Sequence, residues 1–171
     1  MDISKQMLKQ CQNSSINKVC KGMLEFLTVQ ESCCYDAIVC TWALMYEQPQ
    51  KVLNQCQRLL KNGGYLYILV NDQQTLPQIR KIYPKLLIEY VGSINKLMFD
   101  LPMPNNAQQL ERWAKKAGLK NCRVTSKKQE FYFTDWNRAA KFVTSTGALA
   151  GYDAMLDLKN EKIFNTLVEQ L

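Results

Sequence analysis

The sequence predicts an α/β fold, a layered sandwich whose sheet is mostly parallel and ends in an antiparallel hairpin. The first observation is a strand–helix–strand run with short connections, in which residues 35–41 and 65–70 are the strands and residues 49–60 the helix. Such units form parallel sheets with right-handed crossovers. The second observation is that two strand-like tracts, 119–126 and 129–134, are joined by a tight turn, which favours antiparallel pairing.

The first elements follow from apolar spacing. Residues 3–12 form a predicted helix that Asp2 or Ser4 can cap. Its apolar face consists of Ile3, Met7, Leu8 and Cys11. Residues 18–20 are a short candidate strand. The tract 35–41 carries apolar residues on both faces, a pattern typical of a parallel strand that is covered on both sides.

The second helix begins at Pro49, a residue that suits the first turn of a helix. Its core face consists of Val52, Leu53, Cys56, Leu59 and Leu60. We expect Asn62-Gly63-Gly64 to end it, because glycine tolerates a left-handed cap, and the apolar strand 65–70 to follow. A helix over residues 73–83 is expected to end at Pro84, and residues 86–99 fit neither pattern.

The C-terminal half adds three predicted helices. Pro102 and Pro104 indicate a loop before the first of these helices, at 106–117, which Gly118 ends. The second helix lies around residues 136–143 and ends at Gly147, and the third covers 160–171. Their apolar faces are Leu110, Trp113, Ala114 and Ala117; Trp136, Ala139, Ala140 and Val143; and Ile163, Phe164, Leu167, Val168 and Leu171.

Composition excludes several classes of protein. Hydrophobic residues make up 47% and charged residues 22% of the 171 residues, which is typical of a globular domain. The net charge of +7 is spread along the chain, and the densest lysine groups, Lys115-Lys116 and Lys127-Lys128, are each only a pair, which favours plain surface charge over a nucleic-acid site. Seven cysteines without a CxxC, and no histidine, argue against a zinc site and favour a reduced, cytoplasmic location. No apolar run approaches the ~20 residues of a membrane helix.

Three tracts carry a resemblance to a known family. They are Asp2-Ile3-Ser4-Lys5-Gln6-Met7-Leu8; Tyr35-Asp36-Ala37-Ile38-Val39-Cys40 with Trp42-Ala43-Leu44-Met45-Tyr46; and Arg58-Leu59-Leu60-Lys61-Asn62-Gly63-Gly64. In this order they resemble the class I S-adenosylmethionine (SAM) dependent methyltransferases, methyltransferase type 11, with Asn62 in place of the usual proline. Residues 133–157 are more loosely similar to the trans-aconitate and malonyl-carrier-protein methyltransferases.

The resemblance implies a Rossmann-like methyltransferase domain over residues 1–171, with 73–105 and 135–171 as substrate-side or capping elements. It implies SAM as the cofactor and a small-molecule methyl acceptor, for example a carboxylate. The residues that it places around the cofactor are Asp2, Ile3, Met23, Leu24, Cys40, Thr41, Trp42 and Tyr46. Asp2 would accept hydrogen bonds from the ribose hydroxyls, although it also fits as a simple helix cap. For Trp42 and Tyr46 the alternative is ordinary core packing.

Two departures from the family's pattern matter. Many relatives have an acidic residue at the position of Met23 that binds the adenine amino group; Met23 is a weak acceptor, and Glu25 is the nearby alternative. The family's glycine-rich loop is also missing, since no G-x-G occurs in the sequence. We therefore expect an N-terminally truncated domain that lacks the first strand and this loop.

The missing strand would leave strand 35–41 with an unpaired apolar edge, which invites pairing with another chain. We therefore expect a homodimer, through paired 35–41 strands or an exchanged 3–12 helix, or a complex with a separately encoded N-terminal half.

Three functions remain open. The first is SAM-dependent methylation of a small molecule, with Tyr46, Trp42 and Tyr67 as polar candidates near the site. The second is a non-catalytic methyltransferase-like remnant that acts as a dimerisation or interaction module. The third is a basic RNA-binding module, which ranks last because no aromatic and basic stacking platform is visible.

Overall fold

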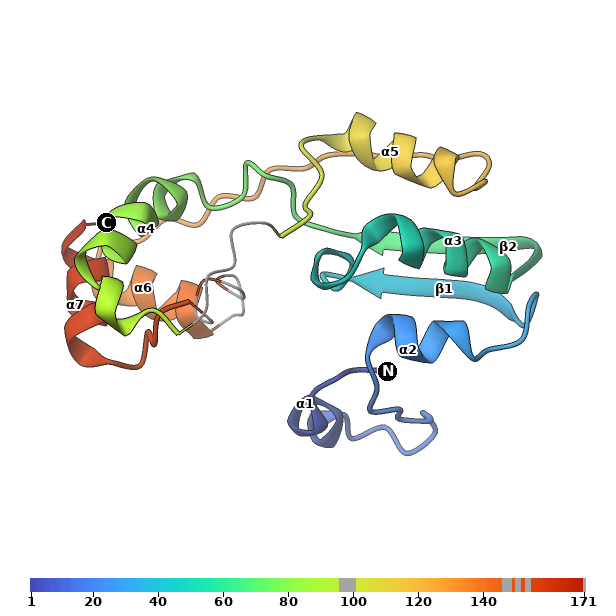
Figure 1. Ribbon diagram of the computed structural model, residues 1–171, viewed down its shortest axis with the longest axis horizontal. Coiled ribbons are helices and arrows are strands. Elements are labelled where there is room, and N and C mark those ends of the chain that lie inside the picture. The colour runs from blue at the N-terminus through green and yellow to red at the C-terminus, as the bar shows by residue number, and fades with distance from the viewer. Residues whose placement is uncertain (96–100, 146–148, 150–151, 153–154, 171) are drawn as a thin grey trace. The chain divides into compact units, whose positions relative to one another are not determined.

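The chain folds into two compact units. The computed structural model describes residues 1–95, 101–145, 149, 152 and 155–170. The first unit comprises residues 1–73 and 102–126, and the second comprises residues 74–101 and 127–171 (Figure 1). The resemblance implies a single domain over residues 1–171 with capping elements. This division into two units does not test that implication, which stays a prediction. Each unit is described by itself below.

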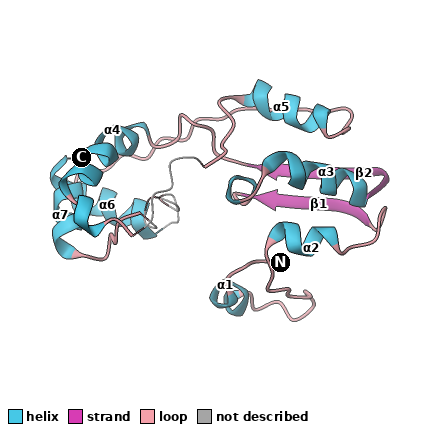
Figure 2. Ribbon diagram, viewed as in Figure 1, coloured by secondary structure: helices cyan, strands magenta, loops and turns pink. Residues whose placement is uncertain are grey.

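A parallel sheet forms the middle of the first unit. Strands β1 (Tyr35–Thr41) and β2 (Leu60–Leu69) pair in parallel, with Val39 beside Tyr67, and the helix α3 (Pro49–Leu59) connects them (Figure 2). Because a parallel pair needs a crossover connection, the strand–helix–strand prediction is confirmed for this unit. In its described residues the sheet has two strands, so the fold is mixed α/β and compatible with part of a methyltransferase domain.

The prediction that Asn62-Gly63-Gly64 ends α3 is wrong. The helix ends at Leu59, and Leu60 is already extended and paired with Tyr35. The next paired residues are Ala37 and Tyr65, so the glycines form a bulge in β2. Gly63 has φ = 81°, and a Cβ on Gly64 would lie 3.0 Å from the Asp36 carbonyl oxygen. The glycines therefore permit a close backbone approach inside the strand.

Helices cover one face of this sheet. They are α2 (Met23–Thr28), α3 and α5 (Ala107–Lys116), and α5 and its stop at Gly118 follow the prediction. The helix α1 (Lys5–Gln10) and the 3₁₀ turn η1 (Leu44–Tyr46) complete the unit. The buried core consists of Leu27, Cys40, Leu44, Val52, Leu53, Cys56, Leu59 and Leu110.

The other face of the sheet is open, so the prediction that strand 35–41 is covered on both sides is wrong within the described residues. Val39 is 68% exposed, Tyr65 65% and Tyr67 57%, whereas Cys40 on the opposite face is buried. The alternation of side chains across a strand explains the difference. Apolar residues on both faces show that a strand can be buried on both sides, but among the described residues of this unit the helices pack on one face only.

The second unit is helical. Its elements are α4 (Pro77–Glu89), the 3₁₀ turn η2 (Val91–Ser93), α6 (Trp136–Ser145) and α7 (Glu161–Gln170). They surround a separate core that contains Ile79, Ile82, Tyr83, Leu86, Val143, Leu149, Met155, Leu156, Leu158, Ile163 and Leu167. The helix predicted to end at Pro84 instead continues through it to Glu89, since burial of Tyr83 and Leu86 offsets the backbone hydrogen bond that proline lacks. The expected stop at Gly147, residues 96–100 and Leu171 lie outside the described residues.

The predicted hairpin of 119–126 and 129–134 is wrong, because neither tract is a strand. Val124 packs on the core of the first unit, whereas Phe131 and Phe133 lie 4.7 and 5.4 Å from the Phe142 ring of the second unit. The two tracts therefore pack in different hydrophobic cores. Because each tract buries its apolar side chains in its own unit, the two do not pair as a hairpin.

Candidate functional site

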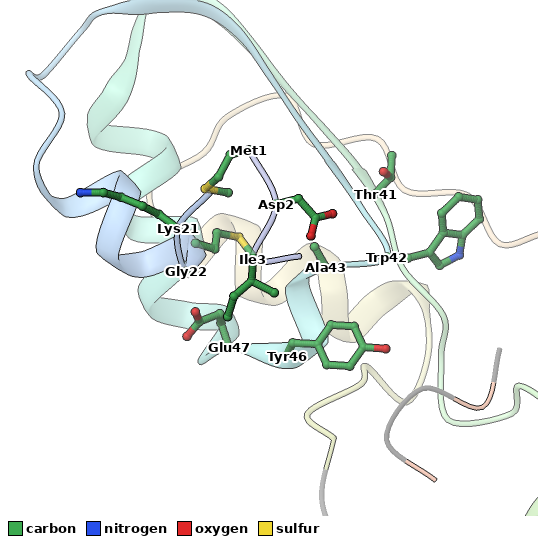
Figure 3. A pocket seen from close by; sticks show the side chains of 11 residues that line it. Met1, Asp2, Ile3, Lys21, Gly22, Thr41, Trp42, Ala43, Tyr46 and Glu47 are labelled. Atoms are coloured by element: carbon green, nitrogen blue, oxygen red, sulfur yellow. The ribbon is translucent and has the colours of Figure 1, made fainter. Parts of the chain in front are cut away.

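A pocket lies where β1 ends. It has a volume of about 330 Å³ and is built by three segments of the first unit: the N-terminal residues, the start of α2 and the turn after β1 (Figure 3). Open parallel sheets place ligands at this end of their strands. The lining residues are Met1, Asp2, Ile3, Lys21, Gly22, Met23, Thr41, Trp42, Ala43, Tyr46 and Glu47.

The pocket brings together most of the residues that were expected to hold the cofactor. Asp2, Ile3, Met23, Thr41, Trp42 and Tyr46 all line it. Leu24 and Cys40 do not; both pack in the core, on α2 and β1. Their roles in binding, like those of the lining residues, stay predictions.

Asp2 is held in place by a backbone bridge. Its N–H donates to the Val19 carbonyl oxygen at 3.1 Å, in an isolated parallel bridge between Asp2 and Cys20. Its half-buried carboxylate accepts from the Ser4 N–H at 2.7 Å. Ser4, not Asp2, is the N-cap of α1, and its hydroxyl accepts from the Met7 N–H. In Figure 3 the Asp2 carboxylate lies amid the labelled side chains, a position that suits a ligand contact.

Besides Asp2, the acidic residue that lines the pocket is Glu47, which the sequence did not single out. Glu25 forms an ion pair with Lys21 at 3.6 Å and does not line the pocket. Glu47, just beyond the 40–46 tract, does line it, and its Oε1 lies 3.9 Å from where a Cβ on Gly22 would be. The spacing of the sequence alone could not show that this turn meets the start of α2.

Cys40 is a core residue in this structure. Burial raises the pKa of its thiol, and hydrogen bonds from the Ala43 and Leu44 backbone counter that rise in part. Burial and the neighbouring Cys40 raise the pKa of the Cys56 thiol to about 12. Because the thiolate is the nucleophile, the raised pKa values disfavour reaction at both thiols. Both side chains pack in the buried core of the first unit.

Trp42 has a strained backbone at the rim of the pocket. Its φ is 50°, a left-handed conformation in which a bulky side chain is an outlier, and its N–H donates to the Leu69 carbonyl at 2.7 Å. The indole is 55% exposed, so core packing does not explain the strain. Figure 3 shows the ring directed away from the other lining side chains. Strain of this kind concentrates at functional sites.

The strain predicts an unusual order of stability. Trp42→Gly and Trp42→Ala both remove the ring, but only glycine accepts this backbone conformation without a penalty. We expect the free energy of unfolding of the glycine variant to be about 1 kcal/mol higher than that of the alanine variant. Urea unfolding followed by circular dichroism measures the difference. Equal stability of the two variants, or a more stable alanine variant, would contradict a strained Trp42.

In the part of the chain that is described, no group of three or more cysteine, aspartate or glutamate side chains is placed to hold a metal ion. Every helix among the described residues is also too short or too polar to cross a lipid bilayer.

Comparison with known proteins gives one match. No curated protein and no solved structure matches the chain. The model of the family described as "Methyltransferase domain" matches residues 1–68, which include β1, α3, nearly all of β2 and every lining residue of the pocket. The match over residues 1–68 supports a class I SAM-dependent methyltransferase domain in this part of the chain.

Proposed function

We propose that the pocket at the end of β1 binds the adenosine part of SAM, and that the protein methylates a small molecule such as a carboxylate. The observation that carries this proposal is the Asp2 carboxylate, which a backbone bridge fixes in a pocket whose other walls are partly apolar. Methyltransferase domains of this family generally use SAM. The acceptor and the activity of this chain are part of the proposal.

The lining residues suit a nucleoside. A carboxylate accepts hydrogen bonds from the two hydroxyls of a ribose, as in other nucleotide-binding sheets. Ile3, Met23 and Ala43 offer apolar surface to a purine ring, and the Glu47 carboxylate is an acceptor on the same wall. A volume of about 330 Å³ is near the lower end of the ~300–1,000 Å³ typical of small-molecule sites.

For the methionine part of SAM we name no comparable binding residues, because the sequence has no G-x-G loop. When bound, SAM supplies an electrophilic methyl group on a sulfonium centre. The residues of this chain would contribute orientation: Trp42 and Tyr46 lie at the rim, where they can position an acceptor and exclude water. Alignment of the reactants supplies most of the catalysis in such a transfer. A carboxylate acceptor needs no general base.

The test is calorimetric titration of S-adenosylhomocysteine into the purified chain, with Asp2→Asn as the matched variant. We expect the wild type to bind at or below ~100 μM. Asparagine retains an oxygen for the Ser4 N–H but presents an amide group in place of the second carboxylate oxygen. Because a hydrogen bond to a charged group contributes about 1.5–3 kcal/mol, binding should weaken about 10-fold to 100-fold.

Ser4→Ala provides the control. It removes the cap that accepts from the Met7 N–H and leaves the Asp2 carboxylate in place. It should weaken α1 by about 1 kcal/mol and bind S-adenosylhomocysteine like the wild type. A folded wild type that shows no binding, or an Asp2→Asn variant that binds equally well, would contradict the proposal.

A second candidate is the non-catalytic interaction module. The open sheet face supports it, since exposed apolar side chains gathered on one face typically mark an interaction surface. Failure to bind S-adenosylhomocysteine in a folded, self-associating chain would favour this function.

A further inference from the structure

We infer that two copies of this chain associate through the free edge of β1, which pairs antiparallel with the same strand of the second copy. This inference does not depend on the pocket binding SAM. It rests on the backbone of β1, on the absence of charge along its edge, and on the lack of any feature that would protect that edge.

The first step is the direction of the backbone groups. The Trp42 N–H donates to Leu69 of β2, and backbone groups alternate in direction along a strand. The N–H and C=O groups of Ala37, Val39 and Thr41 therefore point away from β2. Among the described residues no other strand pairs with β1, so this row of donors and acceptors can bind another strand.

The second step is that the free edge of β1 carries no protecting feature. The bulge at Lys61–Gly64, with Gly63 at φ = 81°, interrupts only the start of β2 and leaves the facing segment of β1 regular. From Ala37 to Thr41, β1 is regular and carries no proline, lysine or bulge. Its free edge has none of the features that keep strands apart.

The third step identifies the occupant as a second copy. With a two-fold axis at Val39, Val39 lies opposite its counterpart and Ala37 lies opposite Thr41, all as pairs that exchange two hydrogen bonds. No charge lies within the paired segment, and Asp36 at its end is neutralised by Lys61 at 2.9 Å. Chains of charge +7 can therefore meet here without placing like charges opposite each other. A charged peptide would find no counter-charge on the strand.

The test is the mass of the full chain in solution, measured by sedimentation equilibrium at micromolar concentrations. We expect twice the monomer mass of 19.8 kDa. Val39 is 68% exposed, so the monomer accommodates Val39→Lys, but two lysines would then lie opposite each other across the axis. This variant should weaken the dimer about tenfold or more. The amide protons of Val39 and Thr41 should exchange more slowly in the dimer than in this variant.

Tyr65→Lys is the matched control, because it adds the same charge to the same open face but on β2, away from the edge. It should remain dimeric. A mixture of Val39→Lys and Val39→Glu chains should regain the dimer, since the opposed residues then attract each other. A monomeric wild type, a dimer that Tyr65→Lys disrupts as strongly, or a mixture without rescue would each overturn edge pairing at Val39.

Discussion

Replacing Leu53 by alanine is expected to lower the free energy of unfolding of the first unit by ~2–5 kcal/mol. Leu53 is 0% exposed and lies on α3, in the core that covers the sheet. Truncation removes buried methyl groups and leaves a cavity that its neighbours, Val52 and Leu59 among them, can fill only in part. The loss is large against the ~5–15 kcal/mol of a typical domain.

The measurement is hydrogen exchange resolved by segment, with Leu86→Ala as the matched control. Leu86 is also 0% exposed, but it belongs to the separate core of the second unit. Leu53→Ala should accelerate exchange in β1 and β2 and spare α7, and Leu86→Ala should do the reverse. Equal acceleration across the whole chain by both variants would contradict two independent cores.

The sequence predicts α3 and its two strands well because local pattern and final packing agree there. Val52, Leu53, Cys56 and Leu59 repeat at helical spacing, and the structure buries all of them. The same agreement holds for α5, where Asn106 caps the helix and Gly118 follows it. Where an element is long and its apolar face meets one core, periodicity is sufficient.

Prediction failed where the outcome depended on distant partners. Apolar residues on both faces of β1 could not show that Val39 stays 68% exposed in the described part of the chain. The hairpin failed because Val124 and Phe131 pack in different units. The short helix α2 was not predicted from the sequence. At the site, the resemblance predicted Asp2 and Trp42. Glu47 could be identified only from the structure, in which the turn after β1 lies beside the start of α2.

Replacing Arg58 by alanine is expected to lower the free energy of unfolding of the first unit by about 3 kcal/mol. Its guanidinium donates to the carbonyl oxygens of Leu27 and Gln30, both at 2.9 Å, at the C-terminal end of α2. It also donates to Ser32 Oγ and Gln55 Oε1. Alanine leaves these acceptors without the donor that joins α2 to α3, so α2 should loosen.

Arg58→Lys separates geometry from charge. Lysine keeps the charge but lacks the planar set of donors that reaches two carbonyls at once, so it should recover less than half of the loss. Arg112→Ala, at an exposed position on α5, is the control and should change stability by no more than about 0.5 kcal/mol. Urea unfolding measures all three variants. Because α2 begins at Met23, which lines the pocket, Arg58→Ala should also weaken the binding of any ligand in this pocket. Full rescue by lysine would mean that the positive charge near the end of α2, and not the set of directed hydrogen bonds, holds this wall in place.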